Sequence, residues 1–215
     1  VSFKTPWTTK FQSGDLLAIY PANDSRERLY SIGKHDGKLQ LVVKLHEYGL
    51  GSGYLNQLEI GAKIKARVIT NTAFHFPKQA TKVALISNGT GIAPFLGMIQ
   101  ESTPKTETHL YCGFRTETKS VASYTKLAQE MMDQQRLQSF NLALSRIPNG
   151  CRVTDLIERD AAFFKALLNE NGVIMICGSL AMQKDVEKVL ETLLEESNTS
   201  VSDYKAKGQI LTDCY

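Results

Sequence analysis

The stretch from Lys82 to Gln100, KVALISNGTGIAPFLGMIQ, places the strongest constraint on how this chain folds. Val83 to Ile86 is a short apolar run, and apolar residues resume at helical spacing after Asn88-Gly89-Thr90-Gly91. We therefore predict a strand, a tight loop and a helix, with Pro94 in the first turn of that helix.

The loop between this strand and this helix suits a phosphate-bearing ligand. Gly89 and Gly91 have no Cβ, so the backbone can turn sharply and approach a ligand closely. The exposed N–H groups and the positive end of the following helix attract anions, and Thr90 adds a hydroxyl. A plain strand-to-helix turn could carry the same three residues, so Gly-Thr-Gly alone leaves both interpretations open.

Composition sets the broad class. The 215 residues are 42% hydrophobic and 22% charged, which is typical of a soluble globular chain with one large or two small domains. A net charge of +3 is too small to indicate nucleic-acid binding, and no apolar run approaches the length of a membrane span. The four cysteines lie far apart, so we expect no zinc, no locally ligated iron-sulfur cluster and a reducing compartment.

The first third of the chain, up to about Phe76, has the pattern of a β domain. Short apolar or alternating runs are separated by turn-forming residues, as in a barrel or sandwich. The expected strands are Leu16 to Tyr20, Leu29 to Ile32, Leu39 to Leu45 and Ile64 to Ile69, with a turn at Pro21-Ala22-Asn23-Asp24.

The rest alternates strands and helices, which predicts a doubly wound five-stranded parallel sheet. The expected strands are Val83 to Ile86, Leu110 to Gly113, Phe140 to Leu144, Val173 to Ile176 and Gln209 to Thr212. We expect four helices in this part of the chain. The first follows the glycine loop and ends near Gln100, the second spans Ser120 to Gln135, the third is capped by Thr154-Asp155 and runs to Leu168, and the fourth spans Ala181 to Glu196. Ligands of such sheets bind beyond the carboxyl ends of the strands. Gly89-Thr90-Gly91, Cys112-Gly113, Ser145-Arg146 and Cys177-Gly178 all fall at these ends.

Two polar strings stand out in the β domain. In Arg28-Leu29-Tyr30-Ser31-Ile32, strand alternation sends Arg28 and Tyr30 to one face and Ser31 to the other. Gly49-Leu50-Gly51-Ser52-Gly53-Tyr54-Leu55 has three alternating glycines, whose backbone amides can form a concavity that holds an anion. A surface arginine beside a half-buried tyrosine, and a flexible hairpin loop, are the plainer interpretations of these strings.

Three further groups fall at strand ends of the second domain. Ser145 and Arg146, with Arg152 nearby, offer donors that a ribose 2′-phosphate needs, although a solvated arginine pair would look alike. Cys177 could be an inert core thiol, and a terminal Tyr215 is ordinarily frayed.

Taken together, these strings resemble the ferredoxin-NADP reductase family, and in particular the FAD/NADPH module of diflavin reductases. In that family the glycine loop reads Gly-x-Gly-Thr-Gly-Ile-Ala-Pro-Phe, and only its first glycine departs here, as Ser87. The chain also follows the family's pattern in five other strings, which are Arg-x-Tyr-Ser, a second FAD loop, Ser-Arg, Cys-Gly and a final triplet of an acidic residue, a spacer and an aromatic residue. The tyrosine and glutamine that the family carries beside its basic residue are absent from Arg152-Val153-Thr154-Asp155.

The resemblance implies an FAD barrel over residues 1–76, which could be truncated, and an NADP(H)-binding domain over 77–215. For FAD, Arg28 would pair with a phosphate, Tyr30 would pack on the flavin, and Ser31 would lie near its reactive nitrogen. The second loop, which wraps the pyrophosphate, comprises Gly49, Leu50, Gly51 and Ser52. For NADPH, the implied contacts are Gly89, Thr90, Gly91, Arg115, Ser145, Arg146, Arg152, Cys177, Gly178, Met182 and Tyr215.

The implied activity is transfer of hydride from NADPH to FAD, followed by single electrons to a carrier. Ser31 and Cys177 would orient the two rings, Asp213 would stabilise charge on the nicotinamide, and Tyr215 would cover the flavin until NADPH arrives. The expected partner is an FMN-binding flavodoxin-like domain, a ferredoxin or a haem protein, and the expected location is the cytoplasm or the cytoplasmic face of a membrane. An NADH-dependent reductase feeding an oxygenase, and a non-catalytic domain with weakened FAD binding, are the alternatives.

Overall fold

The computed structural model describes residues 1–21, 24–103, 105–195 and 199–215, and the chain divides into two units. Unit 1 comprises Val1–Phe76 and Ala93–Met98, and unit 2 comprises Pro77–Ile92 and Ile99–Tyr215. The helix after the glycine loop therefore has its middle in unit 1 and its two ends in unit 2. The cofactor assigned to each predicted domain stays a prediction.

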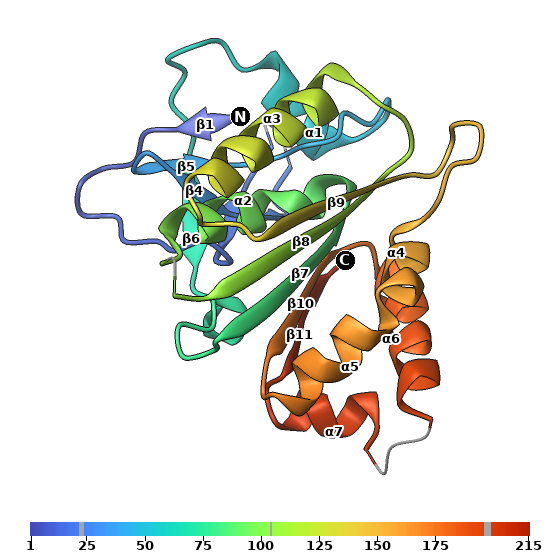
Figure 1. Ribbon diagram of the computed structural model, residues 1–215. Helices are drawn as coiled ribbons and strands as arrows, with labels where there is room; N and C mark the ends of the chain where they lie inside the picture. The colour runs from blue at the N-terminus through green and yellow to red at the C-terminus, as the bar shows by residue number, and fades with distance from the viewer. Residues whose placement is uncertain (22–23, 104, 196–198) are drawn as a thin grey trace. The chain divides into compact units, whose positions relative to one another are not determined.

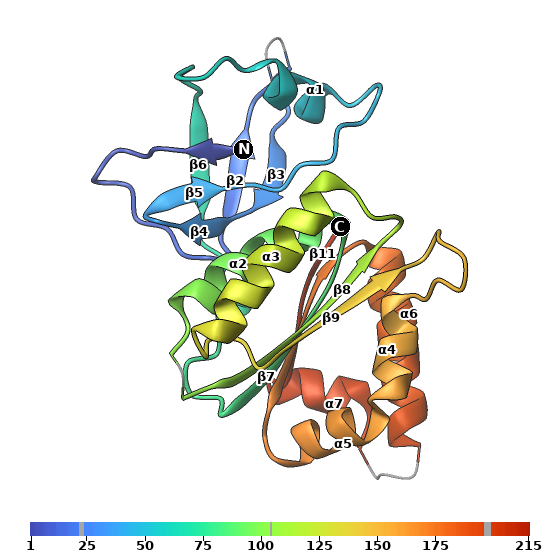
Figure 2. The same cartoon turned by 45° about the horizontal axis from the view of Figure 1, so that its top comes forward.

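Unit 1 is built from short antiparallel strands around one small core. Figure 2 shows its two three-stranded sheets, ordered β1-β5-β4 and β3-β2-β6. The core contains Leu17, Ile19, Ile32, Leu39, Leu41 and Leu55. The elements are β1 Ser2–Phe3, β2 Leu16–Ile19, β3 Arg28–Ser31, β4 Gly33–His35, β5 Lys38–Gln40, α1 Leu50–Gln57, β6 Ala66–Ile69 and the 3-10 turn η1 Thr72–Phe74. The predicted small antiparallel β domain is confirmed.

Unit 2 is the predicted parallel sheet of five strands, and their order is β11-β10-β7-β8-β9 (Figure 1). The strands are β7 Lys82–Asn88, β8 Glu107–Phe114, β9 Ser139–Leu144, β10 Val173–Gly178 and β11 Ile210–Cys214. The other elements are η2 Gly89–Gly91, α2 Ile92–Glu101, α3 Lys119–Asp133, α4 Val153–Arg159, α5 Ala161–Asn169, α6 Leu180–Leu194 and α7 Val201–Ala206. Figures 1 and 2 show α4 to α7 on one face of the sheet and α3 on the other.

The stretch from Gly49 to Leu55 was predicted as a loop, and this is wrong, because α1 begins at Leu50. The amide of Gly53 donates to the carbonyl of Gly49 over 2.7 Å, which closes the first helical turn. Leu55 is 4% exposed and anchors the helix in the core of unit 1. Burial of one apolar side chain thus outweighs the low helix propensity of the glycines.

A single helix from Thr154-Asp155 to Leu168 is also wrong. The first cap is Arg152, whose N–H donates to the Asp155 carboxylate over 2.7 Å, and the chain breaks at Asp160. There the Asp160 carboxylate accepts a 3.0 Å hydrogen bond from the Tyr111 hydroxyl, and it pairs with the guanidinium of Arg159 at 2.7 Å. A carboxylate held by two side-chain partners favours a bend over a continuous helix.

Other boundaries differ in smaller ways. The strand expected from Leu39 to Leu45 ends at Gln40, and beyond it Leu41 pairs with Val1 through backbone hydrogen bonds. The strands β1 and β4 and the helix α7 were not predicted. The turn at Ala22-Asn23 and the helix end at Glu196 lie outside the described residues. Within the described ranges, no helix is long and apolar enough to span a bilayer.

Candidate functional site

The two polar strings of unit 1 meet in the structure. Arg28 and Tyr30 lie on one face of β3, as predicted, and both face Gly51 at the start of α1. A Cβ placed on Gly51 would lie 2.5 Å from the Tyr30 hydroxyl and 3.1 Å from Arg28 Cγ, so only glycine lets the helix approach this closely. Ser31 points to the opposite face and is 6% exposed.

The Arg28 guanidinium is already held in place. Its Nη2 lies 2.7 Å from the Asp24 carboxylate, and its Nη1 donates to the carbonyls of Arg26 and Glu27. The amide and guanidinium of Arg26, and then the guanidinium of Arg28, hold the pKa of Asp24 below its ordinary value. Burial raises the pKa of the Tyr30 phenol, so this ring is neutral at physiological pH.

The first turn of α1 has backbone amides without an acceptor inside the helix, and the Ser52 hydroxyl there is already hydrogen-bonded to the neighbouring backbone. Ser52 Oγ accepts from the N–H of His46 over 3.1 Å and donates to the Gly49 carbonyl over 3.2 Å. The first amides of a helix have no acceptor within it, so the N–H groups after Gly49 are suited to an anion. The roles of Gly49, Leu50, Gly51 and Ser52 toward FAD stay predictions.

In unit 2 the predicted strand-end groups come to one edge of the sheet. The register pairs Ser87 with both Cys112 and Cys177, and it pairs Phe114 with Leu144. The chain breaks after Asn88, Phe114, Leu144 and Gly178 are therefore neighbours along the carboxyl edge. This is the edge where parallel sheets bind ligands.

The glycine loop packs directly on the end of β10. A Cβ on Gly91 would lie 2.1 Å from the carbonyl oxygen of Cys177, so no larger residue fits there. Cys177 is fully buried, and its Cα pairs with that of Asp213 in β11. Met182 is 6% exposed, and its N–H donates to Ser179 Oγ at the cap of α6.

The chain's last residue is fixed to both of these segments. The Tyr215 N–H donates to the Gly178 carbonyl over 3.0 Å, and the Leu180 N–H donates to the Tyr215 carbonyl over 3.2 Å. The Tyr215 hydroxyl lies 3.0 Å from Thr90 Oγ1. Partial burial raises the pKa of this phenol, although 60% of the residue is exposed. The terminal ring is therefore ordered beside the glycine loop.

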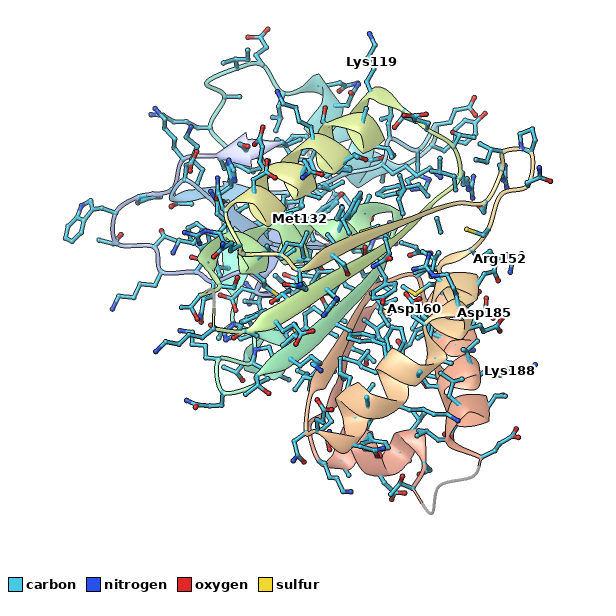
Figure 3. The ribbon with its side chains drawn as sticks, in the orientation of Figure 1. Lys119, Met132, Arg152, Asp160, Asp185 and Lys188 are labelled. Carbon is cyan, nitrogen blue, oxygen red and sulfur yellow. The ribbon has the colours of Figure 1, made fainter. Side chains whose placement is uncertain are left out.

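Three arginines gather at the ends of β8 and β9. The Arg146 N–H donates to the Arg115 carbonyl over 2.6 Å, and the Ser145 N–H donates to the Phe114 carbonyl over 2.9 Å. The exposed side chain of Arg152 lies 3.9 Å from Asp185 on α6 (Figure 3). Exposed guanidiniums are groups that suit an anionic ligand, and the role of these three toward NADPH stays a prediction.

Sequence reasoning missed two polar groups beneath the loop. Asn88 uses both atoms of its amide on Ser179, and Ser87 Oγ lies 3.2 Å from Cys112 Sγ. Burial raises the pKa of the Cys112 thiol to about 12, so this cysteine is not a nucleophile at neutral pH. The sequence does show that Asn88 ends a strand directly before a glycine loop, and this position could have identified it.

Comparison with known proteins agrees with this geometry. The profile of the oxidoreductase NAD-binding domain matches residues 85–188, which contain the glycine loop, the arginine edge and the Cys177 turn. This match agrees with the resemblance of the sequence to the ferredoxin-NADP reductase family.

Proteins similar to the chain include three larger enzymes. It is 32% identical to nitric oxide synthase of Anopheles stephensi, over 85% of this chain and 17% of that protein. It is 27% identical to NADPH-dependent diflavin oxidoreductase 1 of Cryptococcus neoformans, over 94% of this chain and 35% of that one. It is 29% identical to the sulfite reductase [NADPH] flavoprotein alpha-component of Buchnera aphidicola, over 87% of this chain and 36% of that protein. The chain thus spans only about a sixth to a third of these relatives.

Proposed function

We propose that this chain is the reductase module of a flavoprotein, which passes hydride from NADPH to FAD and then single electrons to a carrier. The observation that supports it most is the group of three segments in unit 2. The glycine loop, the Cys177-Gly178 turn and the terminal Tyr215 are joined by direct hydrogen bonds and close packing. A strand-to-helix turn without a ligand role would not need this arrangement.

The donor set of unit 1 fits FAD. Arg28 would hold a phosphate with the donors that Asp24 leaves free, since a guanidinium has five. The α1 amides after Gly49 would hold the pyrophosphate, Tyr30 would pack on the flavin, and Ser31 would hydrogen-bond near the reactive nitrogen. When bound, FAD supplies the exchange between the two electrons of a hydride and single electrons.

The carboxyl edge of unit 2 fits NADPH. Ser145, Arg146 and Arg152 would hold the 2′-phosphate, a group that NADH lacks. Gly89, Thr90, Gly91 and Arg115 would hold the pyrophosphate. Cys177, Gly178 and Met182 would border the nicotinamide, and Asp213 would stabilise positive charge that develops on its ring. The protein thereby supplies position and exclusion of water.

The partner would be a one-electron acceptor, and an FMN-binding flavodoxin-like domain is our first choice. This choice rests on the diflavin and sulfite reductase relatives, which are named as NADPH-dependent flavoproteins. We place the activity in the cytoplasm or at the cytoplasmic face of a membrane, where free cysteines such as Cys112 and Cys177 stay reduced.

The first experiment is the visible spectrum of the purified protein, before and after FAD is added. Flavin absorbance that bleaches with NADPH is expected. A colourless protein that cannot be reconstituted would refute the proposal and favour the non-catalytic alternative. The non-catalytic alternative rests on the ion pair between Arg28 and Asp24, because the Asp24 carboxylate occupies part of the guanidinium.

The second experiment separates NADPH from NADH as the donor. Replacing Arg146 by alanine is expected to lower kcat/KM for NADPH about tenfold or more, with little change for NADH. The matched control is Arg67→Ala, which removes an exposed arginine from β6 in unit 1. The NADH-dependent reductase would be favoured if Arg146→Ala lowered kcat/KM equally with both nucleotides, or if the wild-type protein were faster with NADH than with NADPH.

A further inference from the structure

The side chain of Asn88 links two segments of unit 2 that lie 91 residues apart in sequence. Asn88 Oδ1 accepts a 2.9 Å hydrogen bond from the Ser179 N–H, and Asn88 Nδ2 donates to Ser179 Oγ over 3.0 Å. Both polar atoms of the amide are therefore used on one residue. Two bonds from a planar group fix orientation as well as distance.

The residue held in this way controls a constrained turn. Gly178 has φ of +149°, a conformation that other residues rarely adopt. A Cβ on Gly178 would lie 2.1 Å from Asn88 Oδ1, so the turn rests directly on the amide. Ser179 Oγ also accepts from the Met182 N–H and caps α6. Loss of Asn88 would therefore free the turn and leave the helix cap in place.

The same turn carries the chain's last residue. The Gly178 carbonyl accepts from the Tyr215 N–H, and the Leu180 N–H donates to the Tyr215 carbonyl. The side chain of Tyr215 is held by Thr90, two residues after Asn88. Both attachments of Tyr215 thus depend on the spacing between the glycine loop and the turn.

We propose that Asn88 is a positioning residue, which sets the places of Cys177 and Tyr215 relative to the glycine loop. The role rests on the proposed function, because these two residues border the nicotinamide there. Asn88 acts on the nicotinamide half of the site alone. The arginine edge that receives the 2′-phosphate is held by separate backbone bonds between Arg146 and Arg115.

The first test needs no cofactor and measures alkylation of Cys177 by iodoacetamide, followed by peptide mass spectrometry. Cys177 is fully buried, so labelling requires the turn to open. Asn88→Ala is expected to raise its labelling rate roughly tenfold or more, because it removes both hydrogen bonds to Ser179. Asn88→Asp keeps the acceptor for the Ser179 N–H, and the Ser179 hydroxyl can turn to donate, so near-wild-type labelling is expected.

The matched control is Asn141→Ala, which removes an asparagine that also makes two side-chain hydrogen bonds in unit 2. Asn141 Nδ2 donates to Ser139 Oγ, and Asn141 Oδ1 accepts from Arg159. It lies on β9, and no change in Cys177 labelling is expected. Equal labelling in Asn88→Ala and wild type, or the same rise in both alanine variants, would overturn the proposal.

The second test uses nucleotides. Asn88→Ala is expected to leave the affinity for 2′,5′-ADP unchanged and to shift selectivity toward NADH, the same shift that we expect from removal of Tyr215. Combining the two changes should add little, because both act through the terminal ring. Fully additive shifts would overturn the role. If 2′,5′-ADP fails to bind the wild type, the proposed function fails, and the labelling test still decides whether Asn88 holds the turn.

Discussion

Two glycines in two helices are expected to respond in opposite ways to the same substitution. Gly97 lies inside α2, in the part that belongs to unit 1, and Gly53 lies inside α1. A Cβ on Gly97 would lie 2.3 Å from Ser13 Oγ and 2.4 Å from the backbone nitrogen of Lys34. A Cβ on Gly53 would meet nothing within 4 Å.

The magnitudes follow from these distances. Replacing glycine by alanine inside a helix gains about 0.5 to 1 kcal/mol, and Gly53→Ala should stabilise the protein by that amount. At Gly97 the same gain applies, but real Cβ atoms stay at least 3.0 Å from other heavy atoms, so the Lys34 backbone must move by about 0.6 Å. Overpacking of this kind costs about 1 to 3 kcal/mol, so after the helix gain is subtracted Gly97→Ala should destabilise the protein by up to about 2.5 kcal/mol.

Urea unfolding followed by circular dichroism measures both free energies, with the two variants and the wild type treated alike. Because helix propensity changes equally at the two sites, the difference between the variants isolates the contact of α2 with Ser13 and Lys34. If Gly97→Ala were as stable as Gly53→Ala, the close approach of α2 to this part of unit 1 would be refuted.

Three other predictions concern unit 2. Removing Tyr215 should shift selectivity toward NADH by uncovering the flavin, and unchanged kinetics with both nucleotides would count against this gate. The guanidinium of Arg159 and then the Tyr111 hydroxyl lower the pKa of Asp160. The ionised Asp160 therefore stabilises the folded protein above the ordinary pKa of 3.8, and this stabilisation is lost as pH falls through the lower pKa of the folded state. Urea unfolding should therefore show a gap between wild type and Asp160→Asn at pH 7 that narrows in acid, and a gap independent of pH would contradict this. Iodoacetamide at pH 8 should label the partly exposed Cys151 far faster than Cys112, whose pKa burial raises to about 12, and comparable rates in native protein would show that Cys112 is not buried.

The sequence was sufficient for the architecture of unit 2, because its central strands β7 and β10 contain continuous apolar runs. Such runs have a strong period and clear ends, so their order along the chain determines a parallel sheet. The same reasoning failed for α1, where three glycines hid a helix that depends on burying Leu55. It also failed at Asp160, where partners distant in sequence decide the break.

The individual residues of the site could be predicted from the sequence, but the hydrogen bonds between them could not. The glycine loop, Cys177 and Tyr215 were each identified from local strings. The bonds between them come from Asn88, Ser179 and the main chain, and no local string predicts a bond across 91 residues. Side-chain pairing of this kind depends on the sheet order, which brings β7 and β10 together only in the folded protein.

The ion pair between Arg28 and Asp24 could either hinder a phosphate or prepare its binding site. An arginine loses considerable rotamer freedom when it binds a ligand, and here Asp24 and two backbone carbonyls have already ordered the side chain. The Arg28 side chain is 31% exposed, and ion pairs of partly exposed groups contribute little, so an arriving phosphate can share or replace Asp24 at small cost. Asp24 therefore does not prevent phosphate binding by Arg28, even though it carries the same sign of charge as the ligand.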